Sequence, residues 1–207
     1  MHSLAIALKE NGHEVTGSDD TIFDPSLTQL QKAKISPNQM GWYPEKINQN
    51  LDGVIVGMHA KKDNPELLAA QKMGVPLFSY PEFITHYAWN KTKVVIAGSH
   101  GKTTITAMVL HVLNYHQKSV DYMIGAQLDG FDNSVYLSDN NEFILLEGDE
   151  YLSSPIDSRP KFHHYQPQIA LISGIAWDHV NVFKTQVDYN HQFKIFIDSV
   201  TAGGVLV

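Results

Sequence analysis

The sequence predicts an α/β fold in which a mainly parallel sheet carries a phosphate-binding loop. Short apolar runs alternate with segments of helical periodicity along the 207 residues, which is the pattern of layered α/β proteins. A glycine-containing loop with a lysine lies between one such run and a helical segment, at residues 94–104. No internal repeat or low-complexity tract interrupts this alternation. We therefore expect two α/β units in succession.

The phosphate-binding loop is the most informative stretch. Residues 94–97, Val-Val-Ile-Ala, suit a strand that is covered on both faces. The loop Gly98-Ser-His-Gly-Lys-Thr-Thr104 follows, and its glycines allow backbone N–H groups to turn toward an anion. Lys102 adds a mobile positive charge, and the Thr103 hydroxyl can hold Mg²⁺. Apolar residues then recur at helical spacing from Ile105, so the loop lies at a helix N-terminus.

This loop departs from the general pattern G-x-x-x-x-G-K-[ST], because Ile96 stands where that pattern has glycine. The strand and helix on either side nevertheless favour an ATP site over a glycine turn that only caps a helix. The predicted ATP-binding residues are Gly98, Ser99, His100, Gly101, Lys102, Thr103 and Thr104.

The first unit, residues 1–88, is predicted to be Rossmann-like with its first strand missing. Residues 2–12 form an apparent helix that ends at glycine, and strands are expected at 13–17, 53–57 and 75–78. Asn64 and Pro65 supply an N-cap and a first-turn proline for a helix that runs to Gly74. No strand or glycine loop precedes the first helix, although a dinucleotide-type βαβ unit requires both.

The second unit, residues 89–207, is predicted to be a P-loop NTPase-like domain that is truncated at its C-terminus. Its further strands are expected at 142–146, 169–173 and 204–207. A helix at 187–200 precedes the last strand, with an apolar face predicted at Phe193, Phe196, Ile197 and Val200. Since both ends look incomplete, we expect the chain to be part of a longer protein and to lack turnover alone.

Composition excludes several classes of protein. Without cysteine the chain has neither a disulfide scaffold nor a thiolate metal site. No apolar run approaches the roughly 20 residues of a membrane span, and no signal peptide opens the sequence, so a cytoplasmic protein with no membrane partner is expected. The formal charge of −7 argues against nucleic acid as a partner.

Two further sites follow strands on the same sheet edge, where ligands of parallel α/β sheets bind. Glu147 leads the acidic run Glu147-Gly-Asp149-Glu150 and is the predicted Mg²⁺ ligand; in isolation, such a run is more often a solvated strand end. After the next strand, Asp178-His179 places an imidazole at this edge. His179 is a candidate ligand for a second Mg²⁺, although a single loop histidine is more often structural.

These motifs, in this order and approximate spacing, resemble those of the ATP-dependent Mur ligases of bacterial cell-wall synthesis. Gly17-Ser-Asp19 and Asp63-Asn-Pro-Glu66 resemble the UDP-sugar-binding first domain of the UDP-N-acetylmuramate branch. The resemblance implies an enzyme that transfers the ATP γ-phosphate to the carboxylate of UDP-N-acetylmuramate and then forms an amide with an incoming amine. It also implies a third, C-terminal ligase domain, which is absent here.

Site roles carried over from the resemblance are of three kinds. Lys102, Glu147 and His179 are the expected catalytic residues, and Thr103, Glu147 and His179 the expected metal ligands. Ser18 and Asp19 are expected near the uridine nucleotide, and His59 with Ala60 near its diphosphate. Arg159 is a candidate for a substrate carboxylate, with an exposed surface arginine as the alternative. The family often has asparagine where Gly174 stands, so any side-chain contact made by that asparagine is missing here.

The amine substrate is left between two possibilities. Glu150-Tyr151, Gln192-Phe193 and above all the segment at residues 157–167 look more like the ligase that recycles the tripeptide L-Ala-γ-D-Glu-meso-diaminopimelate. The member that adds L-alanine is the alternative.

A non-catalytic nucleotide-binding module, a P-loop switch or kinase, and an NAD-dependent dehydrogenase are competing classes. The phosphate loop alone would suit the first two classes, and the first βαβ half alone would suit the dehydrogenase. The sequence leaves the oligomeric state open.

Overall fold

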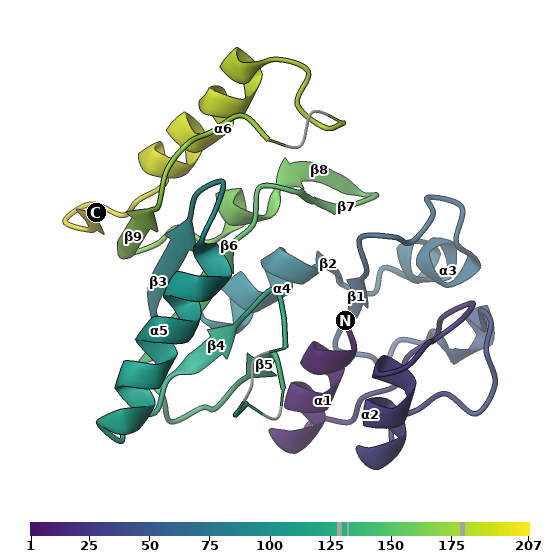
Figure 1. Ribbon diagram of the computed structural model, residues 1–207. Helices are drawn as coiled ribbons and strands as arrows, with labels where there is room; N and C mark the ends of the chain where they lie inside the picture. The colour runs from purple at the N-terminus through teal and green to yellow at the C-terminus, as the bar shows by residue number, and fades with distance from the viewer. Residues whose placement is uncertain (128–129, 132, 179–180) are drawn as a thin grey trace.

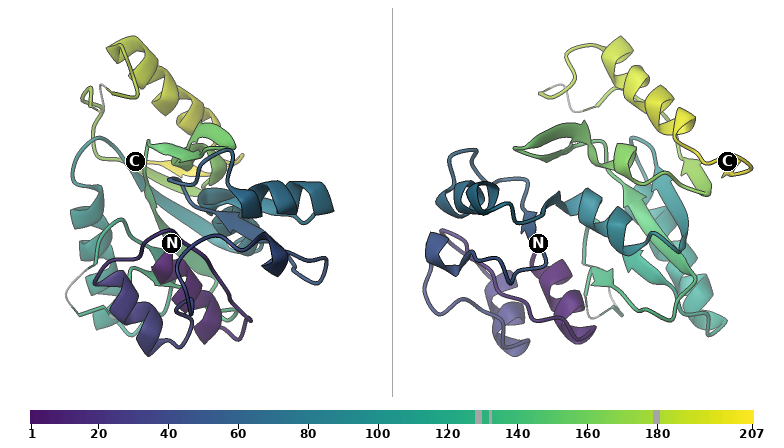
Figure 2. Two further views of the ribbon diagram at one scale, coloured as in Figure 1. Left: turned by 90° about the vertical axis from the view of Figure 1, so that its right-hand side faces the viewer. Right: turned by 180° about the vertical axis from the view of Figure 1, so that it is seen from behind.

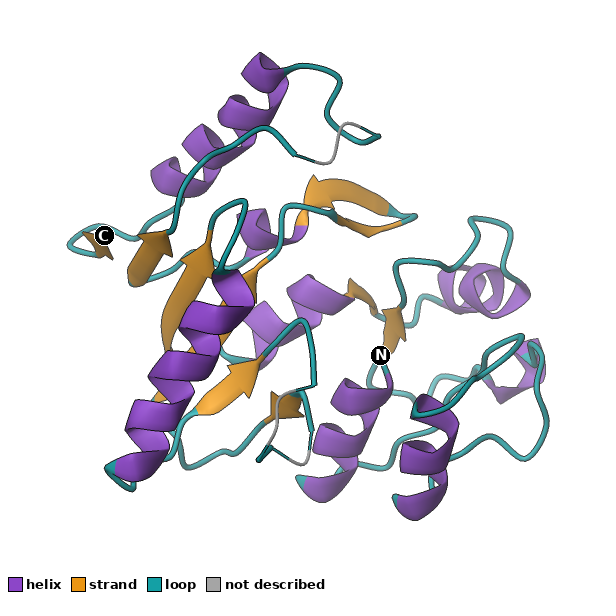
Figure 3. Ribbon diagram, viewed as in Figure 1, coloured by secondary structure: helices purple, strands orange, loops and turns teal. Residues whose placement is uncertain are grey.

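The computed structural model describes residues 1–127, 130–131, 133–178 and 181–207. It contains a central sheet flanked by helices and a smaller N-terminal unit beside it (Figure 1). Figure 3 shows helices on both sides of the central strands. The α/β class predicted from the sequence is confirmed. Among the described residues, no helix is long and apolar enough to cross a membrane.

The central sheet has the strand order β10-β9-β3-β6-β4-β5 in the described residues. Its strands are β3 (Thr92–Ala97), β4 (Asp121–Met123), β5 (Val135–Tyr136), β6 (Phe143–Gly148), β9 (Ile169–Ile172) and β10 (Val205–Leu206). All neighbours pair in parallel except β4 and β5, which are antiparallel. The carboxyl ends of β3, β6 and β9 therefore meet at one edge, as the sequence predicted.

Alternating side chains of β3 and β6 supply two cores, because successive residues of a strand point to opposite faces. On one face, Ile96 and Leu145 pack with α5 (Lys102–Tyr115). On the other face, Val95 and Ile144 belong to a larger cluster to which three helices contribute. These helices are α1 (His2–Glu10), α4 (Tyr80–Tyr87) and α6 (Gln186–Asp198). Figure 2 shows α4 on the face opposite α5.

The N-terminal unit is built around a parallel pair of short strands, β1 (Val54–Val56) and β2 (Leu77–Ser79). Helix α3 (Pro65–Met73) connects them. The Asn64 side chain caps it by accepting from Glu66 N and Leu67 N, and Gly74 ends it in the left-handed conformation, so both predicted signals are confirmed. The unit also contains α2 (Ser26–Lys32) and the 3₁₀ helix η1 (Pro44–Lys46).

The strand predicted at residues 13–17 is wrong. These residues form no strand, and one isolated bridge, between Asp19 and Gly41, follows them. Four of the five residues are exposed, and only Val15 packs against the core, so the segment buries too little apolar surface to be fixed as a strand.

The apolar face at residues 187–200 includes the predicted Phe193, Phe196 and Val200 but not Ile197. In α6 the buried residues are Tyr189, Phe193 and Phe196, which are spaced i, i+4 and i+7, whereas Ile197 is 37% exposed. In α5 the core face passes through Ile105 and Leu110, and Met108 is 64% exposed. In each helix, more than one set of apolar residues recurs at helical spacing. Packing against the sheet decides which of these sets is buried.

Several elements were not foreseen, among them α2, η1, β4 and β5. Helix α4 begins with a capping box, in which Ser79 and Glu82 bond each other's backbone nitrogens. An antiparallel hairpin, β7 (Leu152–Ser154) with β8 (Asp157–Pro160), directly follows the acidic run. The 3₁₀ helix η2 (Lys161–His164) then leads back to the core. In Figure 1 the hairpin extends from the end of β6 toward the N-terminal unit.

Candidate active site

The loop between β3 and α5 has the conformation of an anion-binding loop. Gly98 and Gly101 have φ values of 124° and 80°, which L residues with side chains rarely adopt. A Cβ at Gly98 would also collide with Ser173 Oγ and lie 2.9 Å from Ser173 N. Gly101 is the N-cap of α5, and no side chain caps this helix. The first N–H groups of α5 and its positive dipole end are thus available to a phosphate.

A cavity of about 380 Å³ opens at this loop. It is lined by Ser99, His100, Gly101, Lys102, Thr103, Thr104 and Glu147. Six of the seven predicted ATP-binding residues therefore line one cavity, and the seventh, Gly98, forms the turn behind it. Glu147, predicted from a strand 44 residues further along the chain, completes the wall.

Thr103 and Glu147 form a pair of hard oxygen donors. Thr103 Oγ1 donates to Glu147 Oε1 over 2.7 Å, and Gly125 N donates to Glu147 Oε2 over 2.8 Å. Glu147 is only 8% exposed, yet it borders the cavity, so its carboxylate is held in place and not fully solvated. Hydroxyl and carboxylate oxygens are the ligands that Mg²⁺ prefers, and both residues fit that ion.

Lys102 is held at the cavity by two oxygen atoms. Its Nζ donates to Gly98 O over 2.6 Å and to Glu150 Oε2 over 3.0 Å. Glu150 is fully buried, and its Oε1 accepts from the Tyr189 hydroxyl over 3.1 Å. Tyr189 in turn bonds Ser99 Oγ at 2.9 Å, and burial raises the pKa of its hydroxyl above the ordinary value. The hydrogen bonds among Ser99, Tyr189, Glu150 and Lys102 thus hold the lysine ammonium at the loop.

The segment after β9 is bonded to the phosphate loop at several points. Ser99 N donates to Gly174 O over 3.0 Å, and Ser173 Oγ donates to His100 O over 2.5 Å. Ala176 N donates to Ser99 Oγ over 2.8 Å. The chain then continues to Asp178, which is described, and to His179, which lies outside the described residues. The metal-binding role of His179 stays a prediction.

The predicted UDP-sugar residues lie in exposed loops of the N-terminal unit. Asp19 O accepts from Gly41 N over 2.7 Å, and partial desolvation together with the neighbouring Asp20 raises the pKa of the Asp19 carboxyl. Ser18, half-buried, immediately precedes it. His59 and Ala60 form the turn after β1, where Ala60 N donates to Gly57 O over 3.1 Å. These roles stay predictions.

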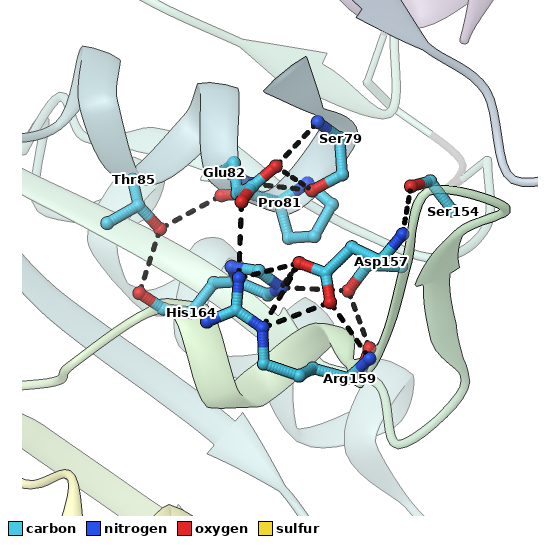
Figure 4. Close-up of polar contacts among 9 residues, drawn as sticks. Ser79, Pro81, Glu82, Thr85, Ser154, Asp157, Arg159 and His164 are labelled. Atoms are coloured by element: carbon cyan, nitrogen blue, oxygen red, sulfur yellow. Dashed lines mark hydrogen bonds and ion pairs between the residues drawn. The ribbon is translucent and has the colours of Figure 1, made fainter. Parts of the chain in front are cut away.

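Arg159, on β8, belongs to a charged cluster (Figure 4) and is not among the residues that line the cavity. Its Nε and NH2 groups donate to Asp157 at 2.6–3.1 Å, and NH2 donates to Glu82 Oε1 over 3.2 Å. His164 Nε2 lies 3.2 Å from Asp157 Oδ2. The oxygen and nitrogen atoms of Glu82, Asp157 and His164 lie close enough together to hold a metal, but the guanidinium supplies the positive charge between the carboxylates.

Sequence reasoning missed four residues of this site: Gly125, Glu150 as the partner of Lys102, Ser173 and Tyr189. The acidic run pointed to Glu150, but not to its partner. Gly125 and Ser173 act through contacts made only in the folded chain, and no local pattern marks them. Tyr189 could have been found as an apolar-face position of α6 that carries a hydroxyl.

Comparisons with known proteins identify the family of this chain. The family model described as "Mur ligase family, catalytic domain" matches residues 1–92, and the "Mur ligase middle domain" matches residues 96–207. The chain is 30% identical, over its full length, to the UDP-N-acetylmuramate–L-alanyl-γ-D-glutamyl-meso-2,6-diaminoheptandioate ligase of Escherichia coli. It is 34% identical over 96% of its length to the UDP-N-acetylmuramate–L-alanine ligase of Lactobacillus acidophilus.

Solved structures show the same likeness. The crystal structure of the Neisseria tripeptide ligase superposes with a TM-score of 0.88 at 28% identity, covering all of this chain and 66% of that one. The Psychrobacter arcticus murein peptide ligase gives a TM-score of 0.82 at 28% identity, covering all of this chain and 46% of that one. The chain spans 45% of the E. coli ligase and 42% of the L. acidophilus ligase. On the match of both domain models, this chain belongs to the Mur ligase family.

Proposed function

We propose that the chain provides the ATP-binding and UDP-sugar-binding parts of an amide ligase that joins UDP-N-acetylmuramate to the tripeptide L-Ala-γ-D-Glu-meso-diaminopimelate. The observation that carries the proposal is the pairing of Thr103 with Glu147 across the phosphate-loop cavity, beside Lys102. It supports the proposal because a hydroxyl–carboxylate oxygen pair that suits Mg²⁺ and a lysine border one phosphate-loop cavity, in a chain that matches both Mur ligase domains.

In this reaction the carboxylate of UDP-N-acetylmuramate attacks the γ-phosphorus and ADP leaves. The amine then attacks the carbonyl carbon of the acyl phosphate, phosphate leaves, and the amide remains. Two anions must approach each other in the first step, so electrostatic positioning dominates the catalysis. Lys102 and the N-terminus of α5 bind the phosphates, and Glu147 with Thr103 would hold Mg²⁺, which neutralises charge on the transferring phosphoryl group.

We propose the tripeptide and not L-alanine as the amine substrate because the backbone of this chain superposes better on tripeptide ligases than on an alanine ligase. Both tripeptide-type ligase structures superpose more closely, with TM-scores of 0.88 and 0.82, than the alanine ligase of Thermotoga maritima, with 0.69. The alanine ligase remains the second candidate, because identity to the L. acidophilus member is 34%.

The test supplies the full-length protein with ATP, Mg²⁺ and UDP-N-acetylmuramate, adds either the tripeptide or L-alanine, and detects the amide product by mass spectrometry. We expect product with the tripeptide and a much slower formation of product by a Lys102→Ala variant. Product with L-alanine alone would establish the second candidate. ATP hydrolysis that ignores both amines and the UDP-sugar would contradict the proposal.

A further inference from the structure

Lys161 is a charged residue that the site described above does not use. Its Nζ lies 2.6 Å from Asp149 Oδ2, and Asp149 follows Glu147 by two residues at the carboxyl end of β6. The backbone reinforces this approach, because Lys161 N donates to Tyr151 O over 2.8 Å and Phe162 N donates to Asp149 O over 3.2 Å. The ammonium group is thus fixed beside the acidic run that carries the predicted metal ligand.

The segment around Lys161 is anchored on both sides. Phe162 and Tyr165 are completely buried in the larger core. On the other side, Arg159 ties β8 to Glu82 of α4 (Figure 4). The side chain of Lys161 is only 19% exposed, which is unusual for a lysine that could reach solvent. These contacts hold the backbone at Lys161 in place, as the backbone of a ligand-binding residue requires.

The segment of Lys161 also approaches the N-terminal unit. Arg159, two residues earlier, donates to Glu82 in the first turn of α4, and α4 directly follows β2. Figure 1 shows the β7–β8 hairpin, which ends directly before Lys161, extending toward this unit. Lys161 therefore follows a segment that connects the acidic run of the central sheet with the end of the N-terminal unit.

We propose that Lys161 binds the carboxylate of the UDP-sugar that accepts the γ-phosphate. This inference rests on the function proposed above and adds a binding residue to it. An ammonium has three N–H donors, and Asp149 is the one partner of Nζ found within the described residues. An incoming carboxylate can take a second donor or displace Asp149, and the positive charge offsets its repulsion from ATP.

The position of Lys161 predicts which ligand it affects. It is absent from the residues that line the phosphate-loop cavity, where Lys102 supplies the lysine. Loss of Lys161 should therefore weaken binding of the UDP-sugar and leave binding of Mg·ATP unchanged. The effect should also depend on the carboxylate. UDP-N-acetylglucosamine lacks the lactyl carboxylate of UDP-N-acetylmuramate, so its affinity should not depend on Lys161.

The experiment measures dissociation constants by isothermal titration calorimetry on the full-length protein and three variants: Lys161→Met, Lys161→Arg and Lys194→Met. Lys194 is the matched control, because it forms a Lys–Asp pair of 2.7 Å with Asp198 on the exposed face of α6. Hydrogen bonds to charged groups contribute about 1.5–3 kcal/mol, so Lys161→Met should weaken UDP-N-acetylmuramate binding roughly 10- to 100-fold. Lys161→Arg, which keeps the charge, should restore part of the affinity.

Binding of Mg·ATP and of UDP-N-acetylglucosamine should stay the same in all variants, which also shows that Lys161→Met is folded. Equal weakening of both UDP-sugars would overturn the carboxylate assignment, and so would unchanged binding of UDP-N-acetylmuramate by Lys161→Met. If the wild-type protein binds Mg·ATP but not UDP-N-acetylmuramate, the proposed function falls together with this inference.

Discussion

The two halves of the molecule present their site residues in different ways. Around the phosphate loop, the residues hydrogen-bond one another: Lys102 to Glu150, Thr103 to Glu147, and Ser99 to Tyr189. In the N-terminal unit, Asp19 and His59 lie on exposed loops beside a two-stranded sheet. The side proposed to bind ATP is therefore organised by its own hydrogen bonds, whereas among the described residues the loops proposed to bind the UDP-sugar have few contacts that hold them.

This contrast has a physical origin. The side proposed to bind ATP lies where three parallel strands end together, and the pairing of these strands brings the residues that follow them to one edge of the sheet. Substitutions there should change both stability and chemistry, because partners are left buried and unpaired. Substitutions on the open loops should change ligand binding alone.

The largest expected effect on stability is that of Lys91→Met at the start of the central sheet. Lys91 is 6% exposed, and its Nζ lies 3.1 Å from Asp121, which is fully buried. Burial already raises the pKa of Asp121, so loss of the ammonium leaves a buried carboxylate without its counter-charge. We expect the free energy of unfolding to fall by about 3–5 kcal/mol, measured by urea denaturation. Lys194→Met, which removes an exposed pair, should change it by less than about 0.5 kcal/mol.

The next effect is on catalysis, through Lys102→Ala. Removing one preorganised electrostatic group should cost about 2–4 kcal/mol of transition-state stabilisation, which is roughly a 30- to 1,000-fold fall in kcat/KM. Steady-state phosphate release by the full-length protein measures it. Turnover close to that of the wild type would remove Lys102 from the mechanism and would weaken the contrast between the two halves.

The smallest effect on stability is expected for Asp19→Asn. Because Asp19 is exposed and only its backbone is bonded across to Gly41, unfolding should change by less than about 0.5 kcal/mol. The KM for UDP-N-acetylmuramate should rise by a few-fold up to roughly tenfold, since one hydrogen bond contributes about 0.5–1.5 kcal/mol. Asp52→Asn, on an exposed residue of the same unit, is the control. A matching loss of stability in Asp19→Asn would mean that this loop is organised like the ATP side.

The sequence predicted the phosphate loop and Glu147 because both depend on local order. The phosphate loop is recognised because a strand, a glycine loop and a helix follow one another directly in the sequence. Glu147 is recognised because the carboxyl ends of parallel strands share one edge of the sheet. The helix over Pro65–Met73 was equally predictable, since Asn64 and Gly74 mark its ends.

Other features depend on contacts between distant parts of the chain. The bond between Lys102 and Glu150 spans 48 residues, and that between Ser99 and Tyr189 spans 90. No local pattern in the sequence predicts either of these hydrogen bonds. The expected strand at residues 13–17 had the right local composition, but no neighbouring strand pairs with it among the described residues. The pairing of Arg159 with Glu82 depends equally on how α4 packs against β8.

In the proposed reaction, the γ-phosphate of ATP passes to the carboxylate of the UDP-sugar at the site of Lys102 and Glu147. The most direct test labels that carboxylate of UDP-N-acetylmuramate with ¹⁸O and analyses the phosphate released by the full-length protein during amide formation. Transfer through an acyl phosphate requires each released phosphate to carry one oxygen atom from the carboxylate. Unlabelled phosphate would contradict the account and would indicate direct hydrolysis of ATP.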